Sequence, residues 1–182
     1  MYKVNNNPLA IQSQHMIADA FINLLQGNDY NDITITQICN EAMLSRRTFY
    51  RNFKVKEDII EFLVDKMTKD IYKGIDYGNV SMEKLLYTYF SYWKNNRDFI
   101  QIIYTNNLFF YLSKKFIDYA KLYIKCDTDM KSKYKYFVNV DKYVVRYIDS
   151  TLSCILELWV ENDFKESVES ISKLTYDLIN KS

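Results

Sequence analysis

The stretch that decides how this chain is interpreted is Ser45-Arg46-Arg47-Thr48-Phe49-Tyr50-Arg51-Asn52-Phe53-Lys54-Val55-Lys56-Glu57. Between Arg46 and Lys56 every charged residue is basic, although the whole chain of 182 residues has a formal net charge of only +1. Such a local imbalance is typical of a surface that faces phosphates, because neutralising phosphates releases counterions and favours binding. For a charge run taken by itself, a solvated helix face is the alternative interpretation.

The residues around this basic run predict two short helices joined by a tight turn. Thr34 is placed to cap a helix over 35–42, and Ser45 is placed to cap a second helix over 46–52. Two short helices so connected make a helix-turn-helix, whose second helix lies in the major groove of DNA with its N-terminal residues at the base edges. Because arginine can bond guanine bidentately, we predict that three residues of this helix read bases: Arg46, Arg47 and Thr48.

The segment from about Ile17 to Lys66 resembles the DNA-binding domain of TetR/AcrR-type transcriptional regulators. The shared patterns are Ile-Thr-Ile-x-x-Ile-Cys, Ala-x-x-Ser, Thr-Phe-Tyr-x-x-Phe and Lys-x-Lys-Glu-Asp-Ile-Ile. The resemblance covers about the first third of the chain and implies that Phe49 and Phe53 are core residues. It also implies phosphate contacts from Thr34, Thr36, Tyr50, Arg51, Asn52 and Lys56.

Two positions depart from the pattern of these regulators. Met43 stands in the turn where many relatives have glycine, so a left-handed backbone there would cost about 1–2 kcal/mol. Arg47 stands where many relatives have a small residue. A bulky cation at that position would add a base contact or change the depth of the helix in the groove, so no operator sequence is transferred from relatives.

The composition predicts an all-α protein. The chain has three glycines and one proline, and no strict alternation of apolar and polar residues predicts a strand. We expect a helix-turn-helix DNA-binding domain over residues 1–56, a connecting helix over 57–73, and a helical effector-binding and dimerisation domain over 74–182. The best candidate for a domain boundary is the segment from Gly74 to Gly78.

Several classes of protein are disfavoured by the sequence. No apolar stretch approaches the length of a membrane span and no signal sequence opens the chain, so we expect a cytoplasmic protein with no membrane partner. Cys39, Cys126 and Cys154 are widely spaced, which favours reduced thiols over disulfides or a metal site. His15 is the only histidine and has no metal-ligand spacing around it, so it is expected to be a surface or near-phosphate residue. We expect neither an enzyme, nor a cofactor, nor a metal.

Aromatic residues are abundant, with 17 tyrosines and 11 phenylalanines, and most of them follow residue 71. Some could line an apolar pocket whose hydroxyls orient a small ligand, although aromatic residues at helical spacing are more often simply core. The family resemblance implies that this domain holds an effector site, and the aromatic character favours a small hydrophobic or aromatic effector. The candidates for the pocket are Tyr89, Trp93, Tyr104, Phe109, Phe110 and Tyr147.

Apolar stripes over about 142–161 and beyond Asp163 predict a closing antiparallel hairpin of two helices. In the resembled family such a hairpin pairs with its copy across a two-fold axis, whereas the sequence alone also allows the stripes to close the monomer core. We favour the homodimer, because one short recognition helix rarely reads enough base pairs. The candidates for the interface are Tyr147, Thr151, Ile155, Leu158, Trp159, Ile171, Leu174 and Leu178.

The function predicted from the sequence is that of a transcriptional regulator, most simply a repressor. It would bind a palindromic operator in double-stranded DNA as a homodimer, and a small effector in the C-terminal domain would control it. The alternative that stays open at this point is a DNA-binding regulator whose C-terminal domain receives a protein partner. An enzyme using His15 or a cysteine is a third hypothesis, which the sequence disfavours.

Overall fold

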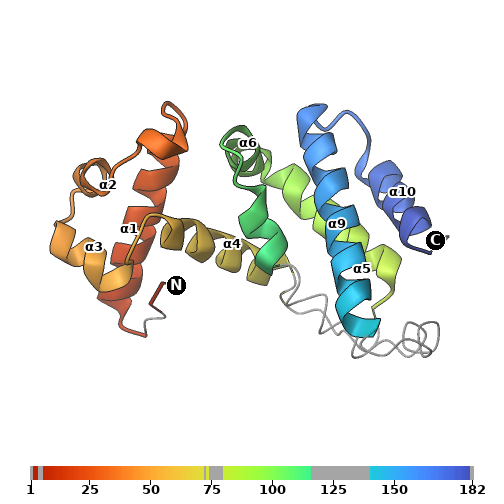
Figure 1. The fold of residues 1–182 in the computed structure, drawn as a ribbon, viewed down its shortest axis with the longest axis horizontal. Coiled ribbons are helices and arrows are strands. Elements are labelled where there is room, and N and C mark those ends of the chain that lie inside the picture. Colours follow the sequence, from red (N-terminus) through yellow and green to blue (C-terminus); the bar gives the residue numbers. More distant parts are fainter. Residues whose placement is uncertain (1, 4–5, 72, 74–79, 116–139, 181–182) are drawn as a thin grey trace. The chain divides into compact units, whose positions relative to one another are not determined.

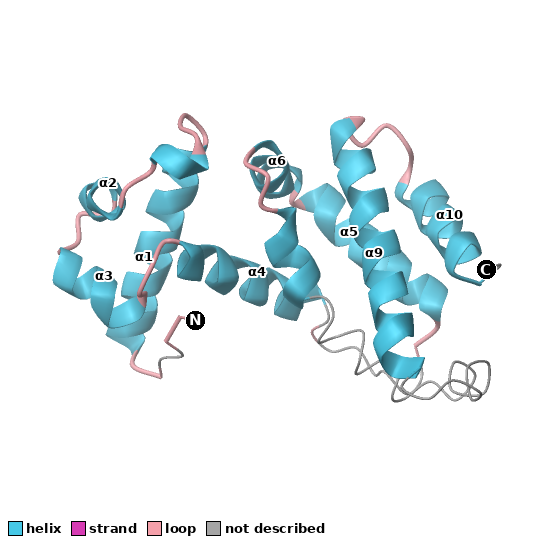
Figure 2. Ribbon diagram, in the orientation of Figure 1, coloured by secondary structure: helices cyan, strands magenta, loops and turns pink. Residues whose placement is uncertain are grey.

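The computed structural model describes residues 2–3, 6–71, 73, 80–115 and 140–180. Within these ranges the regular structure is entirely helical, as Figure 2 shows, so the all-α prediction is confirmed. Contacts divide the chain into an N-terminal unit, Met1–Met67, and a C-terminal unit, Thr68–Ser182. No helix in the described ranges is long and apolar enough to cross a membrane.

The N-terminal unit contains three α-helices, a short 3-10 helix and most of a fourth α-helix (Figure 1). Its elements are α1 (Pro8–Leu25), η1 (Tyr30–Asp32), α2 (Ile35–Glu41), α3 (Arg46–Asn52) and the portion up to Met67 of α4 (Glu57–Ile71). α1 packs against both α2 and α3. The largest fully buried side chains at the centre of this unit are Ile17, Phe21, Ile33, Ile38, Phe49, Phe53, Ile59 and Ile60.

Local capping determines where these helices begin. The side chain of Asn7 accepts a hydrogen bond from the backbone of Leu9, and Pro8 occupies the first turn of α1. Ser45 Oγ accepts a hydrogen bond from the Thr48 backbone N–H at 3.1 Å. The predicted caps at Thr34 and Ser45 are therefore confirmed, and each such cap is worth about 0.5–2 kcal/mol of stability.

The C-terminal unit is a set of packed helices whose described members are α5 (Met82–Asn95), α6 (Arg97–Thr105), a helical segment over 109–115, α9 (Val140–Glu161) and α10 (Val168–Asn180). α10 packs against α5 and α9, and α6 packs against α9. Aromatic rings fill the centre: Phe90 on α5 meets Trp159 on α9 edge-to-face at 5.6 Å, and Trp159 meets Phe164 at 5.0 Å. Edge-to-face pairs of this kind add to the stability gained from burial.

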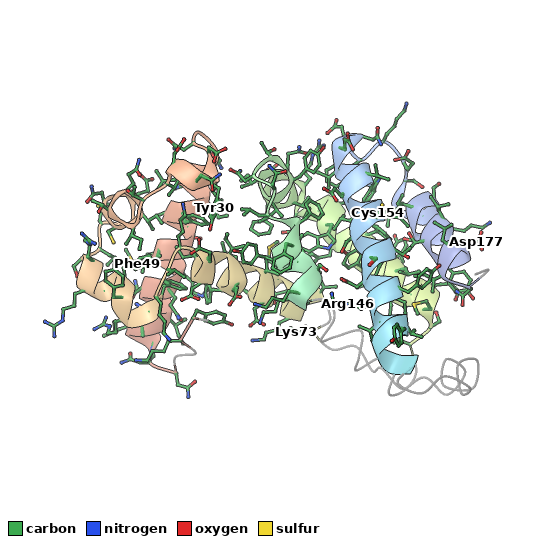
Figure 3. All side chains as sticks on the ribbon, viewed as in Figure 1. Tyr30, Phe49, Lys73, Arg146, Cys154 and Asp177 are labelled. Carbon is green, nitrogen blue, oxygen red and sulfur yellow. The ribbon has the colours of Figure 1, made fainter. Side chains whose placement is uncertain are left out.

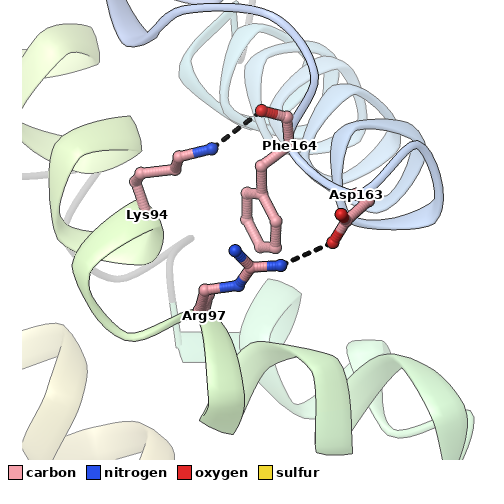
Figure 4. A network of polar contacts seen from close by, with 4 residues as sticks. All are labelled: Lys94, Arg97, Asp163 and Phe164. Atoms are coloured by element: carbon pink, nitrogen blue, oxygen red, sulfur yellow. Dashed lines mark hydrogen bonds and ion pairs between the residues drawn. The ribbon is translucent and has the colours of Figure 1, made fainter.

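A polar network fixes the turn between α9 and α10 against α5 and α6 (Figure 4). Lys94 Nζ donates a hydrogen bond to the Phe164 carbonyl oxygen at 2.7 Å, and Arg97 pairs with Asp163 at 2.5 Å. The Phe164 ring lies between the Lys94 and Arg97 cations, at 5.0 and 5.5 Å. Asp163 and Phe164 both have positive φ, 55° and 56°, so these contacts hold a turn that L-residues seldom adopt.

The unit boundary given by contacts differs in position from the predicted domain limits. It falls between Met67 and Thr68, inside α4, rather than at either end of the expected connecting helix 57–73. The preferred boundary segment from Gly74 to Gly78 lies outside the described residues, as does Cys126. The domain assignment therefore stays a prediction.

Candidate nucleic-acid interface

α3 presents a basic face to solvent and an aromatic face to the core. Arg46, Arg47 and Arg51 are exposed, whereas Phe49 is fully buried inside the N-terminal unit, where Figure 3 labels it. Phe49 lies 5.9 Å from Phe53 between ring centroids. The buried rings thus anchor a short helix whose exposed charges are all positive.

Arg46 and Tyr50 interact across one turn of α3. Arg46 Nη2 donates to the Tyr50 hydroxyl at 3.4 Å, and its guanidinium carbon lies 5.9 Å from the ring centroid. The hydrogen bond to Tyr50 is the main cause that raises the pKa of Arg46, although the guanidinium is fully exposed. The contact with Tyr50 partly orients the Arg46 guanidinium, which is charged like any arginine, before any DNA binds.

Hydroxyl groups gather at the N-termini of α2 and α3. Thr34 and Gln37 form a reciprocal capping box: Thr34 Oγ1 accepts from Gln37 N at 3.2 Å, and Gln37 Oε1 accepts from Thr34 N at 2.8 Å. Thr36 is exposed in the first turn of α2, and the Thr48 hydroxyl lies 3.0 Å from that of Ser45. Thr34 and Thr36 thus occupy exposed positions from which the predicted phosphate contacts are possible.

Asn52 lies in a different environment from the exposed arginines. Its side chain is 1% exposed and its Nδ2 donates to the Thr48 carbonyl oxygen at 2.9 Å. The backbone carbonyl of Asn52 accepts a hydrogen bond from Lys3 N at 3.2 Å. The phosphate contact predicted for Asn52 would first require this side chain to leave the interior.

Tyr2 and Lys3, which precede α1, form hydrogen bonds with α1 and α4 of the N-terminal unit. Gln14 Nε2 donates to the Lys3 carbonyl oxygen at 2.7 Å, and the Tyr2 hydroxyl donates to Asp65 at 2.6 Å. The predicted near-phosphate residue His15 is partly buried, with its ring edge-on to Phe62 at 5.5 Å. Its described contact is therefore with the aromatic core of the unit.

Lys56 is held by three backbone carbonyls. Its Nζ donates to the carbonyl oxygens of Tyr30 at 2.6 Å, Asn31 at 3.2 Å and Ile33 at 3.0 Å, and it lies 4.3 Å from the Tyr30 ring centroid. An ammonium has three N–H donors, and all three are used here. Lys56 therefore connects the start of α4 to the chain just before Thr34, and a phosphate would have to displace one of these bonds.

Replacing Lys56 by Ala should destabilise the protein by about 1.5–3 kcal/mol, the typical worth of hydrogen bonds to a charged group. The loss is measured as a lower urea midpoint. In DNA titrations at several salt concentrations, the slope should stay as in the parent protein. Lys54→Ala, an exposed lysine two residues away, is the matched control and should leave stability unchanged. A parent-like urea midpoint with a flatter salt slope would instead make Lys56 a direct phosphate contact.

Met43, in the turn between α2 and α3, has a left-handed backbone, as expected if the chain accepts strain there. Its φ is 51°, and its side chain is 89% exposed. The turn is closed by hydrogen bonds from Met43 N to Asn40 O at 3.1 Å and from Leu44 N to Cys39 O at 2.9 Å. The side chain is not buried, so it contributes little to offset the backbone strain.

Met43→Gly should therefore stabilise the protein, by about 0.5–1 kcal/mol, because relief of a left-handed conformation exceeds the entropy that glycine adds to the unfolded chain. Urea denaturation gives the midpoint. Met43→Ala removes the same exposed side chain but keeps the Cβ, and should leave the midpoint unchanged. Equal midpoints for Met43→Gly and the parent would show that the turn is not strained.

Comparison with known proteins agrees with this architecture. A TetR-type family model, described as the C-terminal region of transcriptional regulators, matches residues 81–181, which is more than half of the chain. This chain belongs to the TetR family of transcriptional regulators. This match lies C-terminal to the segment from about Ile17 to Lys66 whose motifs resemble the TetR/AcrR DNA-binding domain. The N-terminal and C-terminal parts of the chain therefore indicate the same family. TetR-family proteins are regulators rather than enzymes, which confirms that prediction.

Individual relatives extend over nearly the whole chain. The HTH-type dhaKLM operon transcriptional activator DhaS of Lactococcus lactis is 27% identical over 184 aligned positions, covering 96% of this chain and 91% of DhaS. A TetR transcriptional regulator from Streptococcus agalactiae has a TM-score of 0.66 at 21% identity, covering 94% and 95% of the two chains. FadR from Bacillus subtilis, solved with stearoyl-CoA, has a TM-score of 0.62 at 18% identity, covering 91% and 96%. At these identities the two structures establish the fold alone.

The aromatic residues predicted to line an effector pocket of this TetR-family protein are divided between interior and surface. Tyr89 and Trp93 are buried, at 6% and 1% exposure. Tyr104 and Phe109 are partly buried and pack edge-to-face at 6.2 Å. Phe110 is 71% exposed. Tyr147 is also exposed, with its hydroxyl donating to the Leu178 carbonyl oxygen at 2.9 Å, so only Tyr89 and Trp93 belong to the deep interior.

Sequence reasoning missed a buried acid in this unit. Asp149 on α9 is 3% exposed, and its Oδ2 accepts a hydrogen bond from Ser113 Oγ at 2.7 Å. Burial raises the pKa of its carboxyl group, opposed by the bond from Ser113 and by Arg146. The sequence does contain one indication of this burial: Asp149 lies three residues before Leu152, on the apolar stripe of α9, where an acidic residue is unusual.

The residues predicted for the dimer interface also fall into two sets. Ile155, Trp159 and Ile171 are buried within the monomer. Tyr147, Leu158, Leu174 and Leu178 are 41–51% exposed, and Thr151 is partly exposed. Together with Tyr143 and Cys154, which are also exposed on α9, the exposed set forms a surface that we call the α9–α10 apolar face: Tyr143, Tyr147, Thr151, Cys154, Leu158, Leu174 and Leu178.

Proposed function

We propose that this TetR-family regulator binds a specific, two-fold symmetric DNA operator as a homodimer and that α3 reads the bases. The observation that carries the proposal is the exposed, wholly basic face of α3 at Arg46, Arg47 and Arg51, on a helix anchored from behind by Phe49. Arg46 and Arg47 occupy the first positions of α3, where a recognition helix meets the base edges. Arg51, Tyr50, Thr34 and Thr36 would contact phosphates.

A homodimer is proposed because the α9–α10 apolar face is left exposed in the described part of the monomer. Leu158, Leu174 and Leu178 lie half exposed on two neighbouring helices. Contiguous exposed apolar side chains of this kind mark interfaces between proteins. A second copy satisfies the two-fold symmetry that a palindromic operator requires, with half-sites about 34–36 Å or a multiple apart.

Selection of bound sequences from a randomised duplex pool tests the proposal. We expect a two-fold symmetric motif, and titration of the selected duplex at several salt concentrations should give a steep salt dependence, because several phosphates are neutralised. Binding that depends on salt but selects no motif would reduce α3 to a non-specific basic surface and would contradict the proposal.

Repression is proposed as the mode of action, because a dimer bound across a promoter excludes polymerase without any further domain. Activation is the second candidate, favoured by the name of DhaS, a transcriptional activator that aligns with 96% of this chain. Transcription in vitro from a template carrying the selected operator separates them: repression lowers and activation raises the amount of transcript.

Control by a small hydrophobic or aromatic effector in the C-terminal unit is also part of the proposal. Buried aromatic side chains, including Tyr89 and Trp93, support it. Such an effector changes DNA affinity only if it binds more tightly to one of two conformations of the regulator, one that binds DNA well and one that does not. The exposed Phe110 side chain favours the alternative of a protein partner at this unit, and mass spectrometry of the purified protein for a retained small molecule distinguishes the two.

A further inference from the structure

The interior of the C-terminal unit contains the carboxyl group of Asp149, whose hydrogen-bonding capacity is only partly used. Oδ2 of Asp149 accepts from Ser113, and Arg146 Nη1 approaches the same oxygen only to 4.0 Å from a side chain that is 68% exposed. Oδ1 is buried and has no hydrogen-bond partner within the described part of the chain. Buried polar atoms are nearly always satisfied, so this oxygen requires an explanation.

Two buried aromatic side chains of the same unit, both on α5, also carry polar groups. Tyr89 and Trp93 lie edge-to-face at 6.2 Å. Burial is the main cause that raises the pKa of the Tyr89 hydroxyl, and the charge of Asp149 raises it further. Trp93 Nε1 is buried as well, and it has no hydrogen-bond acceptor among the residues that the structure describes.

The charges of the interior limit which ligands it can receive. Among the described buried residues there is no lysine, arginine or histidine, whereas Asp149 is present in the C-terminal unit. A buried anionic head group would find no cation to pair with and would be repelled by the carboxylate. An organic cation would instead pair with the carboxylate through a charge-assisted hydrogen bond.

We propose that Asp149 recognises the cationic group of the effector, which is therefore an organic ammonium compound with an apolar or aromatic body. The inference rests on the proposed effector control and specifies the chemistry of that site. It adds a charge to the hydrophobic or aromatic effector expected from the sequence.

Three probes with one body and different head groups test the inference on the full-length protein: phenylbutylammonium, phenylbutanol and phenylbutanoate. Binding is followed by tryptophan fluorescence and by the shift in melting temperature. The ammonium probe should bind at least about tenfold more tightly than the alcohol, since its hydrogen bond to the carboxylate is charge-assisted, and the carboxylate probe should bind least tightly. This comparison needs no variant, so it does not depend on the folding of one.

Asp149→Asn should abolish the preference for ammonium over alcohol while leaving the affinity for the alcohol unchanged. Its melting temperature without ligand should equal or exceed that of the parent, because the substitution removes a buried charge. Glu157→Gln, at an exposed carboxylate about two turns further along α9, is the matched control and should keep the preference. A large fall in melting temperature for Asp149→Asn would make Asp149 a structural residue and overturn the inference.

The inference is also overturned if the ammonium probe does not bind at millimolar concentration, or if the alcohol or the carboxylate binds as tightly. Selection of DNA sequences with the parent protein separates this failure from failure of the proposed function. A selected operator without a cation preference would leave the regulator proposal standing and remove only the effector chemistry.

Discussion

A variant carrying Leu158→Glu and Leu174→Glu is expected to be a monomer at concentrations at which we expect the parent protein to be a dimer. Both leucines are about half exposed in the monomer, 51% and 50%, so charged side chains there are tolerated by the isolated chain. In a dimer they would lie within the buried α9–α10 apolar face, where an unpaired carboxylate costs several kcal/mol. Sedimentation equilibrium measures the outcome.

The control for this variant is Lys165→Glu, which adds an acid at an exposed position in the α9–α10 turn and should stay dimeric. The monomeric variant should also lose affinity for a two-half-site operator, on the order of 10²–10⁴-fold, because the second reading head is no longer held near its half-site. A double variant that stays fully dimeric would show that the apolar face is not the dimer interface.

Cys154 offers an independent test of the same face. It is an exposed free thiol on α9, labelled in Figure 3, whereas Cys39 is buried. Burial, the main cause, raises the pKa of the Cys39 thiol and makes it less reactive. In a Cys126→Ser background, a short bismaleimide should join two copies through Cys154, and Cys154→Ser should abolish the covalent dimer.

Much of the fold was predictable because the signals that set it are local. Thr34, Ser45 and Ser81 each cap the helix that follows them, and a cap depends only on the next three residues. The apolar spacing of α9 and α10 likewise needed no tertiary information. The turn at Met43 could be singled out as a place for left-handed backbone, because few residue types fit that conformation easily.

The roles of individual polar side chains were not predictable in the same way. Lys56 and Asn52 both belong to the basic stretch and both looked available to phosphate, yet one ammonium donates to three carbonyls and one amide is buried. The acceptors of the Lys56 ammonium lie between Tyr30 and Ile33, and the acceptor of the Asn52 amide is the Thr48 carbonyl oxygen. Only the packing of α3, α4 and the 3-10 helix decides whether such a group faces solvent.

The burial of individual aromatic side chains in the C-terminal unit was likewise not predictable from the sequence. Tyr89 and Phe110 are both aromatic residues of the C-terminal unit, but one is 6% and the other 71% exposed. Helical spacing identifies which residues share a stripe, and it does not identify what covers that stripe. In α9 it assigned Leu158 and Trp159 to one set, although Trp159 closes the monomer core and Leu158 is half exposed.

The double variant Arg46→Ala, Arg47→Ala is expected to bind the operator no better than random DNA. A bidentate arginine–guanine contact is worth about 1–3 kcal/mol of discrimination, and a dimer makes each contact twice. The fold should survive, because both side chains are exposed and the core contacts of α3 come from Phe49. Competition titration of the selected operator against random duplex gives the ratio of affinities.

Arg51→Ala is the matched control, since it removes the same charge from the same helix one turn further along. It should weaken binding to operator and random DNA equally and reduce the salt slope by about 2, as expected for one lost phosphate contact in each subunit of the dimer. If the double variant instead keeps the full operator preference while losing affinity overall, then Arg46 and Arg47 contact only phosphates. Sequence would then be read by Thr48 or by the shape of the DNA, because they are the remaining sources of discrimination at this helix.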